Sequence, residues 1–152
     1  MKKYTILIAL MLIIGGGIAQ NIVYGYPPLN YRLKSNDFFI VNLPENMDGR
    51  FITLLEFDEI INLLETNPTL HFKFEINIFF GGPKINNLIY AENLEGSFCK
   101  IIKYKSKVSN YEVIPRGSDN AIFLNENHPN YKAYNSRIEI YVVSLDSLPS
   151  SE

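Results

Sequence analysis

The sequence predicts an α+β domain in which a mixed four-stranded sheet carries two helices packed on one face, in the order βαβαββ. Three observations predict this class. Residues 70–78 alternate apolar and polar side chains, which is the period of a strand with one buried face. Residues 57–64 and 91–102 instead place apolar side chains at helical spacing. Because strand and helix patterns alternate along the chain, each helix has a sheet face to cover.

The first strand and the first helix are predicted before residue 70. Residues 38–43 form a short apolar run closed by Pro44, which suits a buried strand. Thr53 and Glu56 have the spacing of a capping box, and Asn67-Pro68 ends the helix that follows it. The apolar stripe of this helix consists of Phe57, Ile60, Ile61 and Leu64.

The second half of the fold is predicted from weaker patterns. Gly81-Gly82-Pro83 ends the alternating strand, and a second helix follows in which Gly96 costs about 1 kcal/mol relative to alanine. Residues 111–114 are expected to form a third strand, residues 115–134 a long polar loop, and residues 138–142 a last strand. The stripe of the second helix consists of Ala91, Leu94, Phe98, Ile101 and Ile102.

Composition excludes several classes of protein. The 152 residues include 14 lysines and arginines against 16 aspartates and glutamates, so no basic face for nucleic acid is expected. The single cysteine, Cys99, allows neither a disulfide framework nor a multi-thiolate metal site. His71 and His128 lack patterned acidic partners, so no metal and no cofactor is predicted. No set of nucleophile, base and oxyanion donor is recognisable, so no catalytic residue is assigned.

The N-terminal residues have the build of a secretory signal peptide. Lys2 and Lys3 precede an unbroken apolar run over 6–14, and Gly17 and Ala19 occupy the small-residue positions of a cleavage site. The run is shorter than the roughly 20 residues of a membrane span. Cleavage before residue 20 leaves 133 residues with 12 basic and 16 acidic side chains. The alternative is a segment that is retained as an anchor.

This organisation divides the chain into a signal peptide over 1–19, an extended leader over 20–37, a domain over 38–145 and a tail over 146–152. Export places the mature protein outside the cytoplasm, with no membrane span after cleavage.

Three strings, in their order and spacing, resemble a known family. FDEIINLL at 57–64, followed by NPTL at 67–70, resembles the "LDxIVxLL…NPxL" passage from the first helix into the second strand of OmpA-like, peptidoglycan-associated domains. NSRIEI at 135–140 resembles the family's closing "NRRVEI" strand. Arg116-Gly117 and the asparagines after it resemble the "GYG…P…N" loop before that strand. The resemblance covers roughly residues 38–144.

The resemblance implies a ligand site, from which this sequence departs. The family holds the zwitterionic diaminopimelate of peptidoglycan with an Asp in a "GHTD" loop after the second strand and an Arg in "LSxxRA" on the second helix. Counting from Asn67-Pro68 places the Asp position at Phe79, and counting back from the second helix places it at Pro83. The Arg position falls at Phe98. Both charges are therefore missing.

Two polar residues of the closing strand remain. Asn135 and Arg137 match the family's pattern, and Arg137 is able to bind a ligand carboxylate or to form an ion pair with Glu139. The candidate ligand-binding residues are accordingly Asn135, Arg137, Phe79 and Phe98.

The resemblance implies a non-catalytic, exported module that is structural or anchoring, in the periplasm or at the outer membrane of a Gram-negative envelope. Its partner would be peptidoglycan or an envelope protein. The first alternative is a protein-binding derivative that has lost peptidoglycan binding. The second is a small secreted enzyme of unrelated α+β fold, which requires a concave site with ionisable groups near His71 or His128.

Tyrosine is abundant outside the predicted core stripes. Exposed tyrosines suit sugar rings or protein partners, because they offer a flat apolar ring with a polar tip. The alternative explanation is compositional bias. The residues concerned are Tyr24, Tyr26, Tyr31, Tyr90, Tyr104, Tyr111, Tyr131, Tyr134 and Tyr141.

Overall fold

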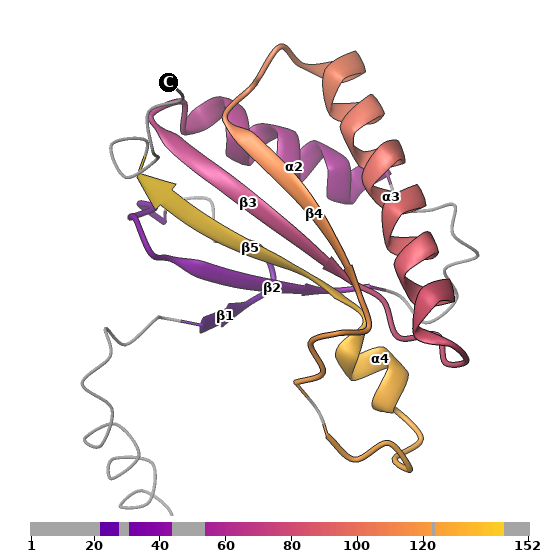
Figure 1. Ribbon diagram of the computed structural model, residues 1–152. Coiled ribbons are helices and arrows are strands. Elements are labelled where there is room, and N and C mark those ends of the chain that lie inside the picture. The colour runs from indigo at the N-terminus through magenta and orange to yellow at the C-terminus, as the bar shows by residue number, and fades with distance from the viewer. Residues whose placement is uncertain (1–21, 28–30, 44–53, 123, 145–152) are drawn as a thin grey trace, which may run out of the picture.

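The computed structural model describes residues 22–27, 31–43, 54–122 and 124–144 (Figure 1). The predicted signal peptide, Thr53 of the capping box and the 146–152 tail lie outside these residues. Within the described part of the chain, no helix has the length and apolar character needed to cross a membrane.

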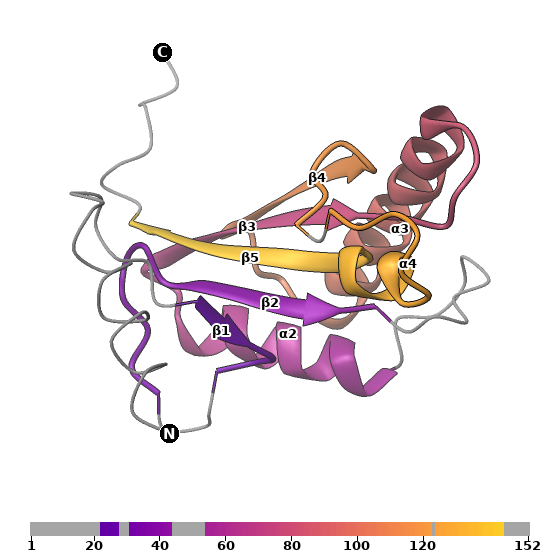
Figure 2. The ribbon, with the colours of Figure 1, turned by 90° about the horizontal axis from the view of Figure 1, so that it is seen from below.

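The predicted α+β class is confirmed, with the four predicted strands in one mixed sheet. The order of strands is β1-β2-β5-β3-β4. β5 lies in the middle, antiparallel to both β2 and β3, whereas β3 and β4 are parallel (Figure 2). The strands are β1 (Ile22–Tyr24), β2 (Phe38–Asn42), β3 (Leu70–Asn77), β4 (Tyr111–Gly117) and β5 (Arg137–Ser144).

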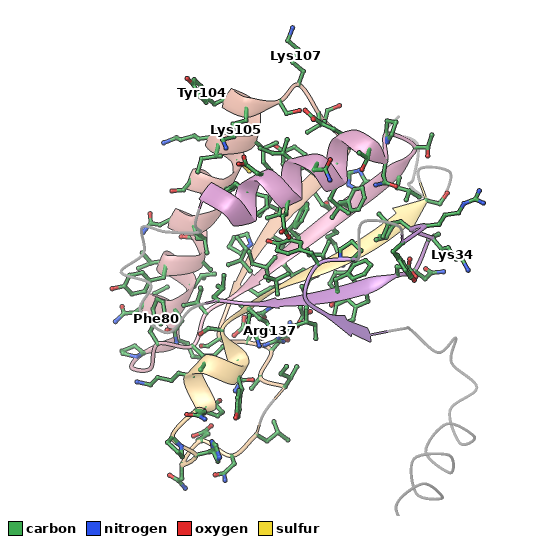
Figure 3. The ribbon with its side chains drawn as sticks, turned by 180° about the vertical axis from the view of Figure 1, so that it is seen from behind. Lys34, Phe80, Tyr104, Lys105, Lys107 and Arg137 are labelled. Carbon is green, nitrogen blue, oxygen red and sulfur yellow. The ribbon has the colours of Figure 1, made fainter. Side chains whose placement is uncertain are left out.

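Two long helices cover one face of this sheet, α2 (Leu54–Thr66) and α3 (Lys84–Lys105) (Figures 1 and 3). The core lies between the helices and the sheet because one set of alternating residues on each strand is apolar. Burial of this apolar surface is the main stabilising term. Side chains with 2% exposure or less in this core include Phe39, Phe57, Ile60, Leu64, Phe72, Phe74, Ile76, Phe98, Ile102, Ile138, Ile140 and Val142.

The structure corrects the predicted loop over 115–134. β4 continues to Gly117, and its Pro115 is tolerated because β4 is an edge strand. A short helix, α4 (Tyr131–Asn135), precedes β5. The sequence of α4 has too few residues for an amphipathic pattern, so its period gave no signal.

Two further features differ from the predicted elements: α3 is longer than its apolar stripe, and part of the predicted leader forms an additional strand. α3 begins at Lys84, directly after the glycine-proline break and about two turns before the apolar stripe starts at Ala91. β1 extends the sheet by a fifth strand, pairing in parallel with β2 at the edge.

Candidate functional site

A cavity of about 480 Å³ lies at the end of the sheet where β3 ends and β5 begins. It has the size of a small-ligand pocket. Four segments far apart in the sequence form its wall: the loop after β3, the start of α3, the loop after β4, and α4. The lining residues are Phe79, Gly81, Gly82, Lys84, Asn87, Ser118, Asp119, Ala121, Glu126, Tyr131 and Lys132.

Phe79 connects the loop after β3 to α4 and to the residue that follows it. Its ring meets the ring of Tyr131 edge to face, with centroids 5.9 Å apart. The Phe79 N–H donates a hydrogen bond of 3.0 Å to Ser136 Oγ. Phe79 is therefore a buried structural part of the cavity wall, with 4% of its surface exposed.

Cationic and amide groups gather at the loop and at the start of α3. Gly81 has a positive φ of 91°, and a Cβ atom placed on it would lie 2.9 Å from Lys132 Nζ. The absence of a side chain at Gly81 thus lets the Lys132 ammonium approach the backbone. Lys84 stands at the first position of α3, whose first turn has no acidic residue and no capping side chain.

Asn87 is the buried polar group of this wall. It is 4% exposed, and its Oδ1 accepts a hydrogen bond of 3.1 Å from the Phe80 N–H. This bond fixes the orientation of the amide. Asn87 Nδ2 has no hydrogen-bond partner among the residues that the structure describes. An amide donor in a cavity wall is suited to a ligand oxygen.

Carboxylates complete the opposite part of the rim. Asp119 and Glu126 come from the loop after β4, and Asp119 Oδ1 lies 3.8 Å from Lys84 Nζ. Both partners of this ion pair are well exposed, with 70% and 79% of their side-chain surfaces accessible. The cavity therefore presents two cations and two anions, an arrangement that complements a zwitterionic group.

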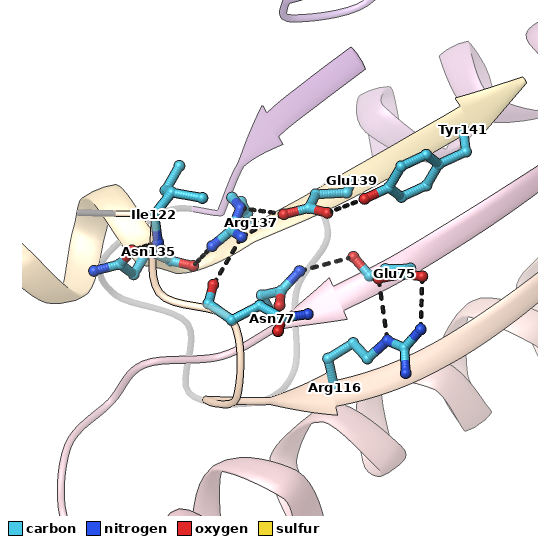
Figure 4. A network of polar contacts seen from close by, with 9 residues as sticks. Glu75, Asn77, Arg116, Ile122, Asn135, Arg137, Glu139 and Tyr141 are labelled. Carbon is cyan, nitrogen blue, oxygen red and sulfur yellow. Dashed lines mark hydrogen bonds and ion pairs between the residues drawn. The ribbon is translucent and has the colours of Figure 1, made fainter. Parts of the chain in front are cut away.

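Arg137 does not line the cavity and belongs to a network of polar contacts at the start of β5 (Figure 4). It is fully buried and donates from Nε to Glu139 Oε1 over 2.7 Å. Its Nη1 donates to the Asn135 carbonyl and its Nη2 to the Asn120 carbonyl, each over 2.8 Å. Of the two roles considered for Arg137, the structure has the ion pair with Glu139, and the guanidinium does not reach the surface.

Asn135 has an equally internal position. It is fully buried, its Oδ1 accepts from the Ile122 N–H over 2.8 Å, and its Nδ2 donates to the Tyr131 carbonyl over 3.0 Å. Asn135 and Arg137 together hold α4 and the loop over 120–122 against the start of β5. They position the cavity wall and do not line the cavity.

Glu75 and Glu139 are direct neighbours across β3 and β5 on the sheet face away from the helices. Each carboxylate has its own cation. Arg116 donates to Glu75 in a bidentate pair, with distances of 3.0 and 2.7 Å (Figure 4). Lys73 Nζ adds a contact of 3.0 Å. The hydrogen bonds from Arg116 hold the pKa of Glu75 below its usual value, against the opposing effect of burial.

Phe98 lies in the hydrophobic core and not among these polar groups. It is fully buried in the core, with its ring centroid 5.3 Å from that of Phe57 and 5.1 Å from that of Phe74. The structure thus brings Phe79, Asn135 and Arg137 together at one end of the sheet, but places Phe98 in the hydrophobic core.

Sequence reasoning missed Lys132 and Asn87. Asn87 carried a recognisable signal, because it occupies the buried stripe of α3 one turn before Ala91, where a polar side chain is unusual. Lys132 carried none, since its position depends on how α4 packs.

The two histidines and Cys99 do not belong to a metal-binding group in the part of the chain that the structure describes. Among the residues that the structure describes, no group of three or more histidine, cysteine, aspartate and glutamate side chains is placed to hold a metal ion. His128 Nδ1 accepts a hydrogen bond from the Asn130 N–H, and its ring stacks on Tyr134. His71 is partly buried on β3. Burial raises the pKa of the Cys99 thiol, which keeps it protonated.

Comparison with known proteins shows the fold. No family model and no curated protein matches the sequence. The structure is similar to that of the peptidoglycan-associated lipoprotein from Burkholderia pseudomallei, with a TM-score of 0.55, 14% identity and coverage of 68% of this chain and 88% of that one. It is also similar to the C-terminal domain of Helicobacter pylori MotB, with a TM-score of 0.55, 18% identity and coverage of 68% and 82%. The chain therefore has the α+β fold of these OmpA-like domains.

Proposed function

We propose that this protein is an exported, non-catalytic OmpA-like domain of a Gram-negative cell envelope, which acts as a structural or anchoring module in contact with peptidoglycan. Two solved structures of the same fold support this proposal, one from a peptidoglycan-associated lipoprotein and one from a periplasmic MotB domain. The N-terminal pattern of a signal peptide is consistent with a periplasmic position.

The observation that carries the proposal is the cavity at the ends of β3 and β5. It opens beside the loop after β3, where the family places its ligand-binding Asp, and it contains charges of both signs. We infer that Lys132 and the Asn87 amide bind the carboxylate of a zwitterionic wall peptide, and that Asp119 and Glu126 bind its ammonium group. In this proposal, these side chains replace the family's Asp and Arg, although they stand at different positions in the sequence.

The proposed binding is weak and sensitive to salt. The Lys84–Asp119 pair is largely exposed, and exposed ion pairs contribute only about 0–1 kcal/mol each. Added salt screens such charges, with a Debye length of about 8 Å at physiological ionic strength. We therefore expect retention on peptidoglycan at low salt and progressive release as salt is added.

Co-sedimentation of the mature chain with purified peptidoglycan sacculi tests this function. We expect the wild-type chain to sediment at low ionic strength and Lys132→Ala to remain largely in the supernatant. Lys107→Ala is the matched control, because Lys107 is an exposed lysine at the opposite end of the molecule from Phe80 and Arg137 (Figure 3). If the wild-type chain stays in solution at low salt, the peptidoglycan proposal is wrong.

One feature favours the second candidate, a protein-binding derivative. Ile85 and Ile89 lie one turn apart on the exposed side of α3, with 58% and 47% of their surfaces accessible. Tyr90 is 44% exposed beside them and packs edge to face on Phe80 at 5.2 Å. Exposed apolar groups close together suit a protein surface. This candidate predicts that the wild-type chain remains in the supernatant with sacculi even at low ionic strength.

A further inference from the structure

A second cavity, of about 430 Å³, lies between the leader and α2. It is independent of the cavity at the end of the sheet and shares no lining residue with it. One wall comes from the leader and the other from a single flank of α2. The lining residues are Tyr26, Pro27, Tyr31, Leu33, Glu59, Asn62, Leu63, Thr66 and Asn67. We call this cavity the tyrosine groove.

The leader wall is aromatic and held in place. The Tyr31 hydroxyl donates to Asp37 Oδ1 over 3.3 Å, and the Tyr31 ring meets Phe39 edge to face at 6.2 Å. Tyr31 nevertheless keeps 36% of its surface accessible. Tyr26 packs against the hydrophobic core. Two rings that are already positioned lose little conformational entropy when a ligand binds.

The α2 wall is polar and available for binding. Glu59 and Asn62 are exposed, three residues apart on the same flank of the helix. Within the described part of the chain, neither side chain forms a hydrogen bond or an ion pair. The Glu59 carboxylate accepts hydrogen bonds, and the Asn62 amide both donates and accepts them.

We infer that the tyrosine groove binds a neutral carbohydrate. A sugar ring has an apolar C–H face that packs on an aromatic ring, and hydroxyl groups at its edge that bond to carboxylates and amides. The groove offers both kinds of surface on facing walls. Its described lining contains a carboxylate and no lysine or arginine, which favours a neutral sugar over a uronic acid or a sulfated one.

This inference goes beyond the proposed function, because it assigns a second site on another part of the fold. It also accounts for two members of the surplus of tyrosines. Tyr26 and Tyr31 come together at one groove, whereas Tyr104 projects alone from the end of α3 with 91% of its surface exposed.

An NMR-detected titration of the full chain with the tetrasaccharide of N-acetylglucosamine tests the assignment. We expect saturable shifts at Tyr31 and Asn62, and no saturation with a uronic-acid tetrasaccharide. Asn62→Ala should weaken binding about tenfold, which corresponds to the loss of one good hydrogen-bonding group. Asn62 is exposed, so this variant leaves the core intact. Tyr31→Phe should retain most of the binding, since the ring remains.

Two controls make the result specific. Tyr104→Ala should bind the sugar like the wild type, because Tyr104 lies near the end of α3 and does not line the groove. Lys132→Ala should also bind the sugar normally while it loses the sacculus, which separates this site from the proposed function. The assignment is wrong if the wild type shows no saturable shift at millimolar sugar, or if Asn62→Ala and Tyr31→Ala both bind like the wild type.

Discussion

At the scale of single residues, the polar groups at the end of the sheet divide into two sets by burial. Arg137, Glu139 and Asn135 are buried and satisfy one another's hydrogen bonds, so they hold loops in place. Lys132 and Asp119 reach solvent and form the cavity rim. The closing-strand segment 135–140 therefore contains residues that position the cavity wall, whereas the charged residues that line the cavity come from outside this segment.

Arg137→Ala should destabilise the fold by about 3–5 kcal/mol, because it leaves the Glu139 carboxylate buried with its cation removed. Chemical denaturation measures this change. The double variant Arg137→Met with Glu139→Leu should recover much of the loss, since it removes both charges and leaves apolar side chains of similar size. A single Arg137→Ala variant as stable as the wild type would contradict the assigned structural role.

The ion pairs of Glu75 should make stability depend on acid pH. The folded-state pKa of Glu75 lies below its ordinary value of 4.5, chiefly because of Arg116. The stabilisation is therefore fully present above pH 4.5 and is lost as the pH falls below it through the folded-state pKa. In denaturant titrations at several pH values, Glu75→Gln should be less stable than the wild type at neutral pH and should lose less stability on acidification. Parallel pH profiles for the two proteins would refute this.

At the scale of elements, α3 shows where sequence patterns suffice and where they do not. The apolar stripe over Ala91, Leu94, Phe98 and Ile102 correctly predicted a helix, because periodic burial is recorded in the residues themselves. Its first two turns were missed, since Ile85 and Ile89 are apolar but exposed. α4 was missed for a related reason, because it is held by tertiary contacts such as the bond from Asn135 Nδ2 to the Tyr131 carbonyl.

Two glycines near α3 should respond in opposite ways to alanine. Gly96 is exposed within the helix, and a Cβ atom there meets nothing within 4 Å, so Gly96→Ala should raise the free energy of unfolding by about 0.5–1 kcal/mol. Gly117 has a φ of 58°, and a Cβ atom would lie 2.8 Å from the Leu88 backbone nitrogen. Gly117→Ala should lower stability by about 1–3 kcal/mol. Thermal unfolding of both variants measures the contrast; stabilisation by Gly117→Ala would show that β4 and α3 are less closely packed than described.

At the scale of the whole molecule, the last strand occupies the centre of the sheet. β5 pairs with β2 on one side and with β3 on the other. The last strand of the described chain therefore lies beside a strand from its beginning. This topology also brings the loop after β3 to the start of β5 and so creates the cavity. The fold class followed from the sequence because its core positions are periodic. The residues that line the cavity could not be predicted in this way, because Gly81, Asn87, Asp119 and Lys132 come together only when this topology forms.

The most direct test of the account is an NMR titration of the mature, isotopically labelled chain with a soluble wall peptide that carries diaminopimelate. The account predicts salt-sensitive shifts at Gly81, Gly82 and Asn87 and at Lys132, with little change at the fully buried Phe98. Shifts confined to other surfaces, or their absence at low salt with millimolar peptide, would contradict the claim that this cavity contacts the cell wall.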